Sequence, residues 1–182
     1  MEERIWQKSY PKSVPVTVDY EKITLSETLK RTAGKYPETV ALIMMGKKIT
    51  YRELDELVDR FATALADLGL KKGDKVAIIL PNMPQVVIAS YAVFALGGVV
   101  VMNNPLYTES ELEHQLNDSE STICICMDLL VPRVLKLKQT TGIETVIACH
   151  ILDYLPFPKK QLFPFIKKKM HRKTDPNEGV YD

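Results

Sequence analysis

The sequence is poor in the glycines that build nucleotide-binding loops. Its 182 residues include eight glycines, and none of their spacings fits G-x-G-x-x-G or G-x-x-x-x-G-K-[ST], the patterns that bring backbone N–H groups against phosphate oxygens. The adjacent pair Gly97-Gly98 is followed by valines, so we interpret it as the exit of a helix. The sequence therefore predicts no phosphate-binding loop in this chain.

Cysteine and histidine are also scarce, and their scarcity excludes several kinds of site. Three cysteines do not make a disulfide framework, and Cys124 and Cys126 lack zinc-site spacing, so we interpret the cysteines as core thiols in a reducing compartment. The histidines His114, His150 and His171 do not converge in the sequence, and no H-E-x-x-H or G-x-S-x-G motif is present. We therefore predict no catalytic, cofactor-binding or metal-ligating residue.

The sequence shows no secretion signal, and its longest uncharged run is a poor membrane span. The first residues, MEERIWQK, are charged and lack an apolar core. No charged residue occurs from Val76 to Tyr107, but Gly97-Gly98 interrupts this run, and a buried helix followed by a buried strand explains it better than a transmembrane helix. We therefore expect a cytoplasmic protein.

Apolar runs and amphipathic helical patterns alternate along most of the chain. Thr50 and Glu53 form a T-x-x-E capping box at the start of one predicted helix, and Thr108 and Glu111 form another. Ser26 is the predicted cap of an earlier helix. The predicted helices cover residues 25–36, 50–68, 84–96, 108–117 and 129–139, and the predicted strands cover 40–45, 49–50, 76–80, 98–102, 122–127 and 145–149.

This alternation predicts an α/β fold. Short apolar strands joined by helical crossovers imply a doubly wound, mostly parallel sheet with helices on both faces. We divide the chain into an irregular N-terminal segment that wraps the surface (1–24), an α/β body (25–153) and a basic, aromatic arm or linker (154–182).

The arm concentrates the positive charge of the chain. Residues 155–173 contain seven lysines and arginines and no acidic residue, together with Phe157, Phe163 and Phe165. Phenylalanines between lysines suit an anionic membrane surface. A basic linker packed against the rest of a larger protein explains the same residues and is the favoured interpretation, and other polyanions stay open as a third alternative.

Four stretches of the sequence together resemble one family. ITYRELDE, KKGDKVAIILPNMPQ, FALGGVVVMNNPLYTESELEHQLNDS and DYLPFPKKQL occur in this order between about residues 25 and 169. In this respect the sequence resembles acyl-CoA synthetases of the adenylate-forming superfamily, and most of all the long-chain fatty-acid CoA ligases. The resemblance implies that the fold is part of the large N-terminal domain of such an enzyme. It also implies scaffold roles for the matching positions: Leu54, Leu57 and Phe61 as helix core, residues 76–80 and 99–101 as sheet core, and Asn104 and Pro105 as a strand-to-helix turn.

The resemblance also implies an activity, cofactors and partners. Such ligases convert a fatty acid, ATP and CoA to acyl-CoA, AMP and pyrophosphate through an acyl-adenylate, with Mg²⁺. Their Ser/Thr/Gly-rich phosphate loop, their nucleotide-binding motifs and the lysine of their C-terminal domain have no matching positions here, so no catalytic, cofactor-binding or metal residue is carried over. We expect an N-terminal portion that is inactive alone and contains no cofactor.

The implied partners are the remainder of the ligase and the fatty acid, with an anionic surface on the inner face of a membrane and a homodimer as further candidates. A nucleic-acid partner is not expected. The alternative to a ligase portion is a non-enzymatic α/β module that binds a partner or a membrane.

Overall fold

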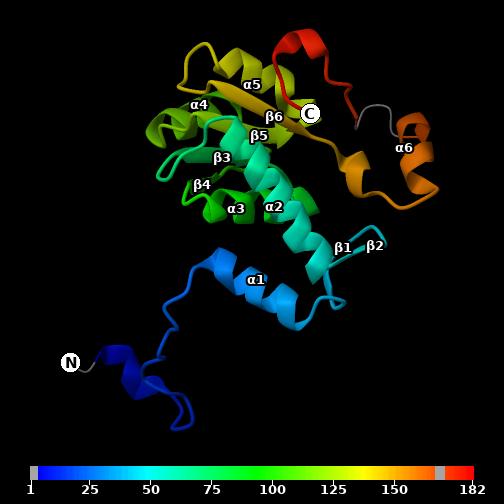
Figure 1. Cartoon of the computed structure of the whole chain (residues 1–182). Helices are drawn as coiled ribbons and strands as arrows, with labels where there is room; N and C mark the ends of the chain where they lie inside the picture. The colour runs from blue at the N-terminus through cyan, green and yellow to red at the C-terminus, as the bar shows by residue number, and fades with distance from the viewer. Residues whose placement is uncertain (1–3, 167–170) are drawn as a thin grey trace.

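The centre of the molecule is a sheet of four short strands that all run in the same direction (Figure 1). The computed structural model describes residues 4–166 and 171–182. The strands are β3 (Lys75–Ile79), β4 (Val99–Met102), β5 (Ile123–Met127) and β6 (Thr145–Cys149), in the spatial order β4-β3-β5-β6. The predicted doubly wound parallel sheet is thereby confirmed.

Alternate residues of the strands point into two separate hydrophobic cores, one on each face of the sheet. Val76, Ile78 and Ile125 pack against the helices formed between residues 25 and 95, whereas Ala77 and Cys124 pack against the helices formed between residues 109 and 137. Because successive side chains of a strand alternate in direction, continuous apolar runs are what a sheet covered on both faces requires. The predicted helical layers on both faces are therefore present.

The helix α1 (Leu25–Lys35) begins two residues earlier than a cap at Ser26 would allow. Thr24, not Ser26, is the N-cap, because its Oγ1 accepts a hydrogen bond from Glu27 N at 3.2 Å and the Glu27 carboxylate accepts one from Thr24 N at 2.7 Å. Ser26 lies inside the first turn. The Ser26 prediction was wrong because the T-x-x-E spacing of Thr24 and Glu27 provides both halves of a capping box.

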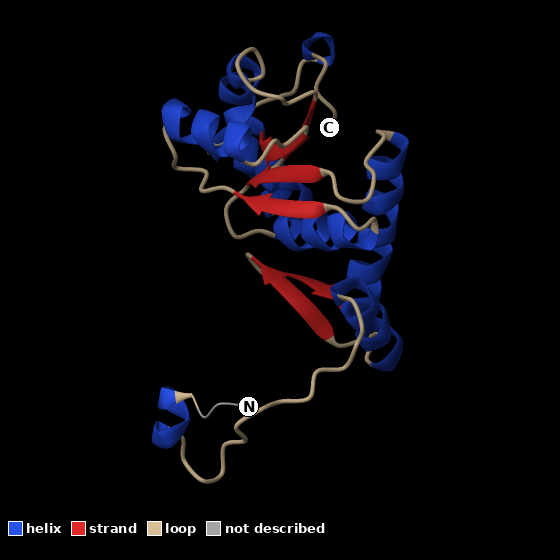
Figure 2. Cartoon of the chain, turned by 90° about the vertical axis from the view of Figure 1, so that its left-hand side faces the viewer, coloured by secondary structure: helices blue, strands red, loops and turns tan. Residues whose placement is uncertain are grey.

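The hairpin formed by β1 (Val40–Met44) and β2 (Lys47–Thr50) is a separate antiparallel pair (Figure 2). It leads directly into α2 (Tyr51–Asp67), which starts at the predicted capping box of Thr50 and Glu53. Leu54 and Leu65 on α2 are buried, but Leu57 and Phe61 are only half-buried. Their assignment to the helix core was therefore too strong, since they lie at the margin where α2 borders an open cavity.

The helix α3 (Pro84–Ala95) and the strand β4 occupy the uncharged run of the sequence. Gly97 has a φ of 72°, and Gly98 N donates to Val93 O at 2.9 Å, so the glycine pair ends the helix as predicted. β4 is an edge strand, and Val99 is 47% exposed. The prediction of residues 99–101 as sheet core is corrected accordingly, because β4 has a hydrogen-bonded neighbour on one side only.

The opposite face of the sheet carries two short helices. α4 (Glu109–Asp118) begins at the predicted capping box of Thr108 and Glu111. The predicted helix 129–139 is divided into the 3-10 turn η2 (Asp128–Leu130) and α5 (Val131–Leu137), which has a proline in its first turn. This division places the side chain of Asp128 at the end of β5.

The two terminal regions are less regular than the body. The N-terminal segment contains the 3-10 helix η1 (Ile5–Ser9) and extends away from the body, and Tyr20 is largely exposed (Figure 1). The prediction that it wraps the surface is therefore not what the structure shows, as it makes few apolar contacts.

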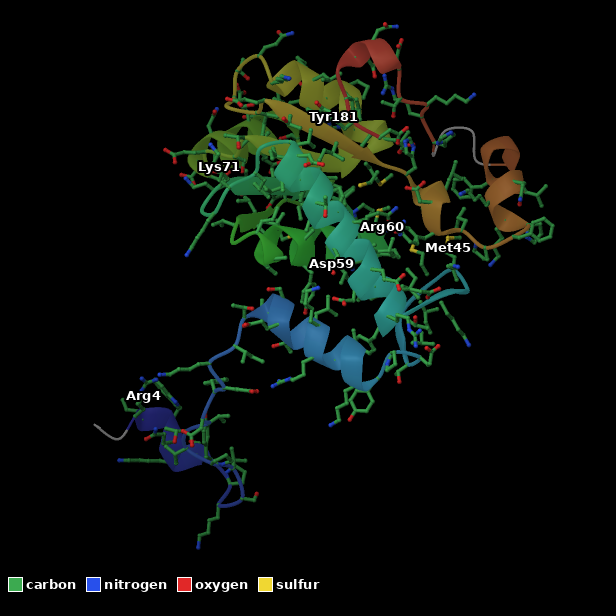
Figure 3. The ribbon with its side chains drawn as sticks, in the orientation of Figure 1. Arg4, Met45, Asp59, Arg60, Lys71 and Tyr181 are labelled. Atoms are coloured by element: carbon green, nitrogen blue, oxygen red, sulfur yellow. The ribbon has the colours of Figure 1, made fainter. Side chains whose placement is uncertain are left out.

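The C-terminal region runs through η3 (Ile151–Tyr154), α6 (Lys159–Ile166) and η5 (Pro176–Glu178), and then returns to the sheet. Tyr181 forms a parallel bridge with Ile147 of β6 (Figure 3). In the described part of the chain, no helix combines the length and the apolar character that crossing a membrane requires.

Candidate functional site

The carboxyl ends of the four parallel strands meet at one edge of the sheet. After β3 the chain adds β4 on one side of β3, and it then crosses to the other side of β3 to form β5. The direction in which strands are added therefore reverses between β3 and β5. Open α/β sheets bind their ligands outside the carboxyl ends of the strands near such a reversal. The residues that follow the strands here are therefore the first candidates for a site.

Asp128, directly after β5, is the most enclosed polar residue at this edge. Its side chain is 0% exposed. Its Oδ1 accepts a hydrogen bond from Leu129 N at 2.8 Å, and its Oδ2 accepts one from Arg172 N at 2.8 Å. Two backbone N–H groups thus fix the orientation of a buried carboxylate, and the C-terminal segment supplies one of them.

Two histidines approach the same carboxylate oxygen. His150, directly after β6, places Nδ1 3.0 Å from Asp128 Oδ2, and His171 places its Nδ1 3.2 Å from that oxygen. The two imidazole rings lie edge to face with centroids 5.5 Å apart. On its other side, His150 Nε2 lies 2.7 Å from Asp182 Oδ1.

Two of the three histidines, which lie far apart in the sequence, come together in the structure. His150 and His171 meet at Asp128. His114 is exposed to solvent on α4 and takes no part in this contact. Asp128 was not among the candidate residues. The sequence carries one signal for the pair of Asp128 and His150, because each directly follows an apolar strand and neighbouring parallel strands end at the same edge.

A separate apolar cavity of about 380 Å³ lies between α2, α3 and η3. Leu57, Phe61 and Arg60 line it from α2, where Figure 3 labels Arg60, and Cys149 and Tyr154 also line it. Burial raises the pKa of the Cys149 thiol to about 12. Cys149 is therefore protonated at neutral pH and is not a nucleophile.

The other two thiols are packing residues. Cys124 and Cys126 lie fully buried on the same face of β5, and all three cysteines are free. The pKa of Cys126 is raised well above its ordinary value, first by its hydrogen bond with Cys124 and then by burial. The interpretation of these residues as core thiols agrees with their burial.

The glycine pair after α3 serves packing. A Cβ atom at Gly98 would lie 2.9 Å from Val93 Cγ1, and one at Gly97 would lie 3.0 Å from Lys72 Cγ. The chain at this point passes into β4 and exposes no row of backbone N–H groups at a helix start. The glycine pair therefore ends α3 and lets the chain pass close to Lys72.

Comparison with known proteins decides the family. The profile of the family described as AMP-binding enzyme matches residues 29–180. The chain belongs to the AMP-binding enzyme family. It is 38% identical over 177 residues to the long-chain-fatty-acid–CoA ligase of Bacillus subtilis, an alignment that covers 97% of this chain and 32% of that protein. It is 37% identical over 172 residues to the ligase of the same description from Yersinia pestis, which covers 93% of this chain and 31% of that protein.

Solved structures of the AMP-binding family have the same arrangement of elements. A long-chain-fatty-acid–CoA ligase from Archaeoglobus fulgidus superposes with a TM-score of 0.67 at 27% identity, over 73% of this chain and 28% of that one. A benzoate CoA ligase from Burkholderia xenovorans gives 0.66 at 25% identity, over 71% and 26%. The chain thus spans about a third of the length of the curated ligases it matches, and the family resemblance predicted from the sequence is confirmed.

Proposed function

We propose that this chain is the N-terminal portion of an ATP-dependent fatty acyl-CoA ligase. The whole enzyme would join a fatty acid to CoA through an acyl-adenylate, with release of AMP and pyrophosphate. The observation that carries this proposal is the similarity to long-chain-fatty-acid–CoA ligases over nearly the whole chain, combined with their sheet arrangement. The role of this portion is to supply a folded sheet on which the remainder of the enzyme assembles.

The residues of this chain do not supply the nucleotide chemistry. Transfer at a phosphoryl group requires a preorganised cradle of donors, a cation and Mg²⁺. Among the described residues, the one adjacent glycine pair packs against Val93 and Lys72 and leads into a strand. ATP, Mg²⁺ and CoA therefore belong to the whole ligase in this proposal, and none of its steps is assigned to a residue of this chain.

Three functional regions divide the chain in this proposal. Residues 25–153 form the scaffold, residues 1–24 are an irregular segment, and residues 154–182 connect to the remainder of the ligase. The bridge of Tyr181 to Ile147 supports the last assignment, because the chain here returns to the free edge of β6 and begins to pair with it. Assembly with the remainder would extend the sheet at this edge.

A peripheral membrane role is the second proposal, and it concerns the basic arm. Phe157 is 81% exposed, and Lys160 and Leu162 near the start of α6 are exposed as well. An aromatic and an aliphatic side chain beside lysines suit insertion at an anionic inner-leaflet surface of a cytoplasmic enzyme. Lys167, Lys168 and Lys169, which contribute most to the predicted charge, lie outside the described residues.

Homodimer formation stays a prediction from the resemblance.

A chimera tests the ligase proposal in cells. Residues 1–182 would replace the matching third of the Bacillus subtilis ligase, and the fusion would be expressed in a bacterial host that lacks its own long-chain ligase. Growth on oleate as the sole carbon source is the expected result, because the scaffold restores the enzyme.

The matched control is the same chimera with Leu65→Asp, which places a charge in a fully buried position of α2. It should not support growth. Failure of the unmodified chimera to support growth, with soluble protein present on an immunoblot, would contradict the proposal, whereas a non-enzymatic module would leave the chimera inactive and the isolated chain stably folded.

A further inference from the structure

The strongest observation that the ligase proposal leaves unused is the meeting of Asp128, His150 and His171. One side-chain oxygen and two imidazole nitrogens of these residues all lie within 4.8 Å of one another. They come from the ends of β5 and β6 and from the C-terminal segment. We propose that they form a binding site for a divalent transition-metal ion of the zinc class.

The contacts of His150 leave its Nδ1 facing the Asp128 carboxylate. Its Nε2 lies 2.7 Å from the carboxylate of Asp182, so a neutral imidazole carries its proton there and presents the Nδ1 lone pair to Asp128 Oδ2 at 3.0 Å. Two lone pairs that face each other at this distance repel unless a proton or a metal ion lies between them. His171 Nδ1, 3.2 Å from the same oxygen, is a second nitrogen that can present a lone pair, and Asp128 Oδ2 keeps a free lone pair beside the bond that it accepts from Arg172 N. Two imidazole nitrogens and one carboxylate oxygen that can all act as donors to a cation therefore converge at one point.

Two of the three separations between the ligand atoms agree with a tetrahedral zinc site, and the third, between the two histidine nitrogens, is within 4.8 Å. Zinc binds nitrogen and oxygen at about 2.0–2.2 Å, which places neighbouring ligand atoms about 3.3 Å apart. The two separations from Asp128 Oδ2 to the histidine nitrogens are 3.0 and 3.2 Å. Small shifts of the two imidazoles would therefore complete three bonds, and water would take the fourth position.

The chemistry of the donors favours zinc over magnesium or calcium. Two imidazoles and one carboxylate suit borderline transition metals, whereas Mg²⁺ and Ca²⁺ prefer sites built from oxygen alone. Asp182 supplies a carboxylate–histidine contact of the kind that orients metal-bound histidines in known sites. The backbone N–H groups of Leu129 and Arg172 hold Asp128 in place for the same purpose.

A route for the ion is present. A cavity of about 450 Å³ borders the cluster, and His150, His171 and Asp182 line it. Lys160 and Lys173 also border this cavity, but both are exposed, so solvent and salt screen their charges, and the carboxylates of Asp153 and Asp182 line the same cavity. The site is thus reachable from solvent although Asp128 itself is enclosed.

A bound ion would fasten the C-terminal segment to the edge of the sheet. Asp128 and His171 are 43 residues apart in the sequence, and the ion would close this loop. Because the unfolded chain lacks the assembled site, zinc would stabilise the folded form. The inference does not depend on the ligase proposal, since it concerns contacts within this chain.

The experiment is a titration of the full 182-residue chain, freed of metal with a chelator, with ZnCl₂ in a calorimeter. We expect one zinc ion per chain. His171→Gln should abolish stoichiometric binding, and Asp182→Asn should weaken it about tenfold through loss of the outer contact. His114→Gln is the matched control, because it removes the exposed histidine of α4 and leaves the cluster intact.

Cobalt gives an independent readout of the ligands. The Co²⁺-loaded chain should show visible d–d bands without the near-ultraviolet thiolate charge-transfer band, since no cysteine takes part. The proposal is overturned if the parent chain binds no zinc at one equivalent, if His171→Gln binds zinc as the parent does, or if cobalt shows thiolate bands. The Asp182→Asn result keeps the test decisive even if His171→Gln lowers the stability of the metal-free chain.

Discussion

Three threonines of this chain begin a helix in the same way. Thr24, Thr50 and Thr108 each accept a hydrogen bond from the backbone N–H three residues later, and the glutamate at that later position accepts one in return. At the scale of single residues, these six side chains satisfy backbone donors that a helix start otherwise leaves without partners. The local sequence thus determines where three of the helices begin.

Removal of one cap should have a measurable cost. Thr50→Ala is expected to lower the free energy of unfolding by about 1 kcal/mol, because Glu53 N loses its acceptor. Chemical denaturation followed by circular dichroism measures the change. Thr63→Ala is the matched control on the same helix, since Thr63 is exposed and its hydroxyl only donates to Asp59 O within the helix. Equal midpoint shifts for the two variants would contradict the cap.

The same capping box predicts a dependence of stability on pH. The hydrogen bond from the Thr50 backbone N–H lowers the pKa of Glu53 in the folded state. A depressed pKa contributes stability above the unfolded value of about 4.3, and that contribution is lost as the pH falls through the folded value.

Glu53→Gln tests this dependence directly. At pH 7 this variant should have a lower free energy of unfolding than the parent. At pH 3 the difference in free energy between the two proteins should be smaller. Glu56→Gln, an exposed change on the same helix, should show no such convergence. A difference between the parent and Glu53→Gln that is the same at both pH values would show that the carboxylate does not act as the cap.

At the scale of whole elements, the close contact between α3 and β4 depends on Gly98, because a glycine has no Cβ atom. A Cβ atom at Gly98 would lie 2.9 Å from Val93 Cγ1 and 3.3 Å from the carbonyl oxygen of Asp74. Gly98→Ala should therefore destabilise the chain by about 1–3 kcal/mol, as overpacking does.

Gly34→Ala is the matched glycine change. Gly34 lies inside α1, and a Cβ atom there would meet nothing within 4 Å. Alanine should stabilise the chain by about 0.5–1 kcal/mol by reducing the entropy of the unfolded state. Thermal unfolding of the two variants measures the opposite signs, and a shift of the same sign in both would contradict the packing described for the α3–β4 turn.

The helices and strands were easier to predict than the way in which they pack against one another. The apolar run at 76–80 and the capping boxes define β3 and two helices locally, and the predicted parallel sheet followed from their alternation. The assignment of Val99 to the sheet core came from the family resemblance, and its apolar run could not correct it, because such a run does not reveal whether a strand lies in the centre or at the edge of a sheet. Phe61 also follows the helical period, and only the packing of α2 shows that it faces an open cavity.

The candidate site was not predicted, for a related reason. Asp128 and His150 each follow a strand, but the contact between them depends on β5 and β6 being neighbours in the sheet. His171 belongs to a segment with no regular structure, and its approach to Asp128 follows from the return of the chain to β6. Sequence spacing carries no information on that return.

At the scale of the whole molecule, the proposed function makes the chain a folded scaffold for a larger enzyme. Two cores hold a parallel sheet, and both edge strands have one side without a full partner strand among the described residues. The chain supplies about a third of the length of the ligases it matches. Its central property is therefore that it should support ligase activity when joined to the remainder and should have none by itself.

The measurement that tests this claim most directly is the rate of palmitoyl-CoA formation by the purified chimera of residues 1–182 with the remaining two thirds of the Bacillus subtilis ligase. With palmitate, Mg-ATP and CoA, the chimera should form palmitoyl-CoA and AMP well above background, and the isolated chain should release no pyrophosphate. A folded, soluble chimera without activity, or an isolated chain that forms acyl-adenylate by itself, would contradict the account.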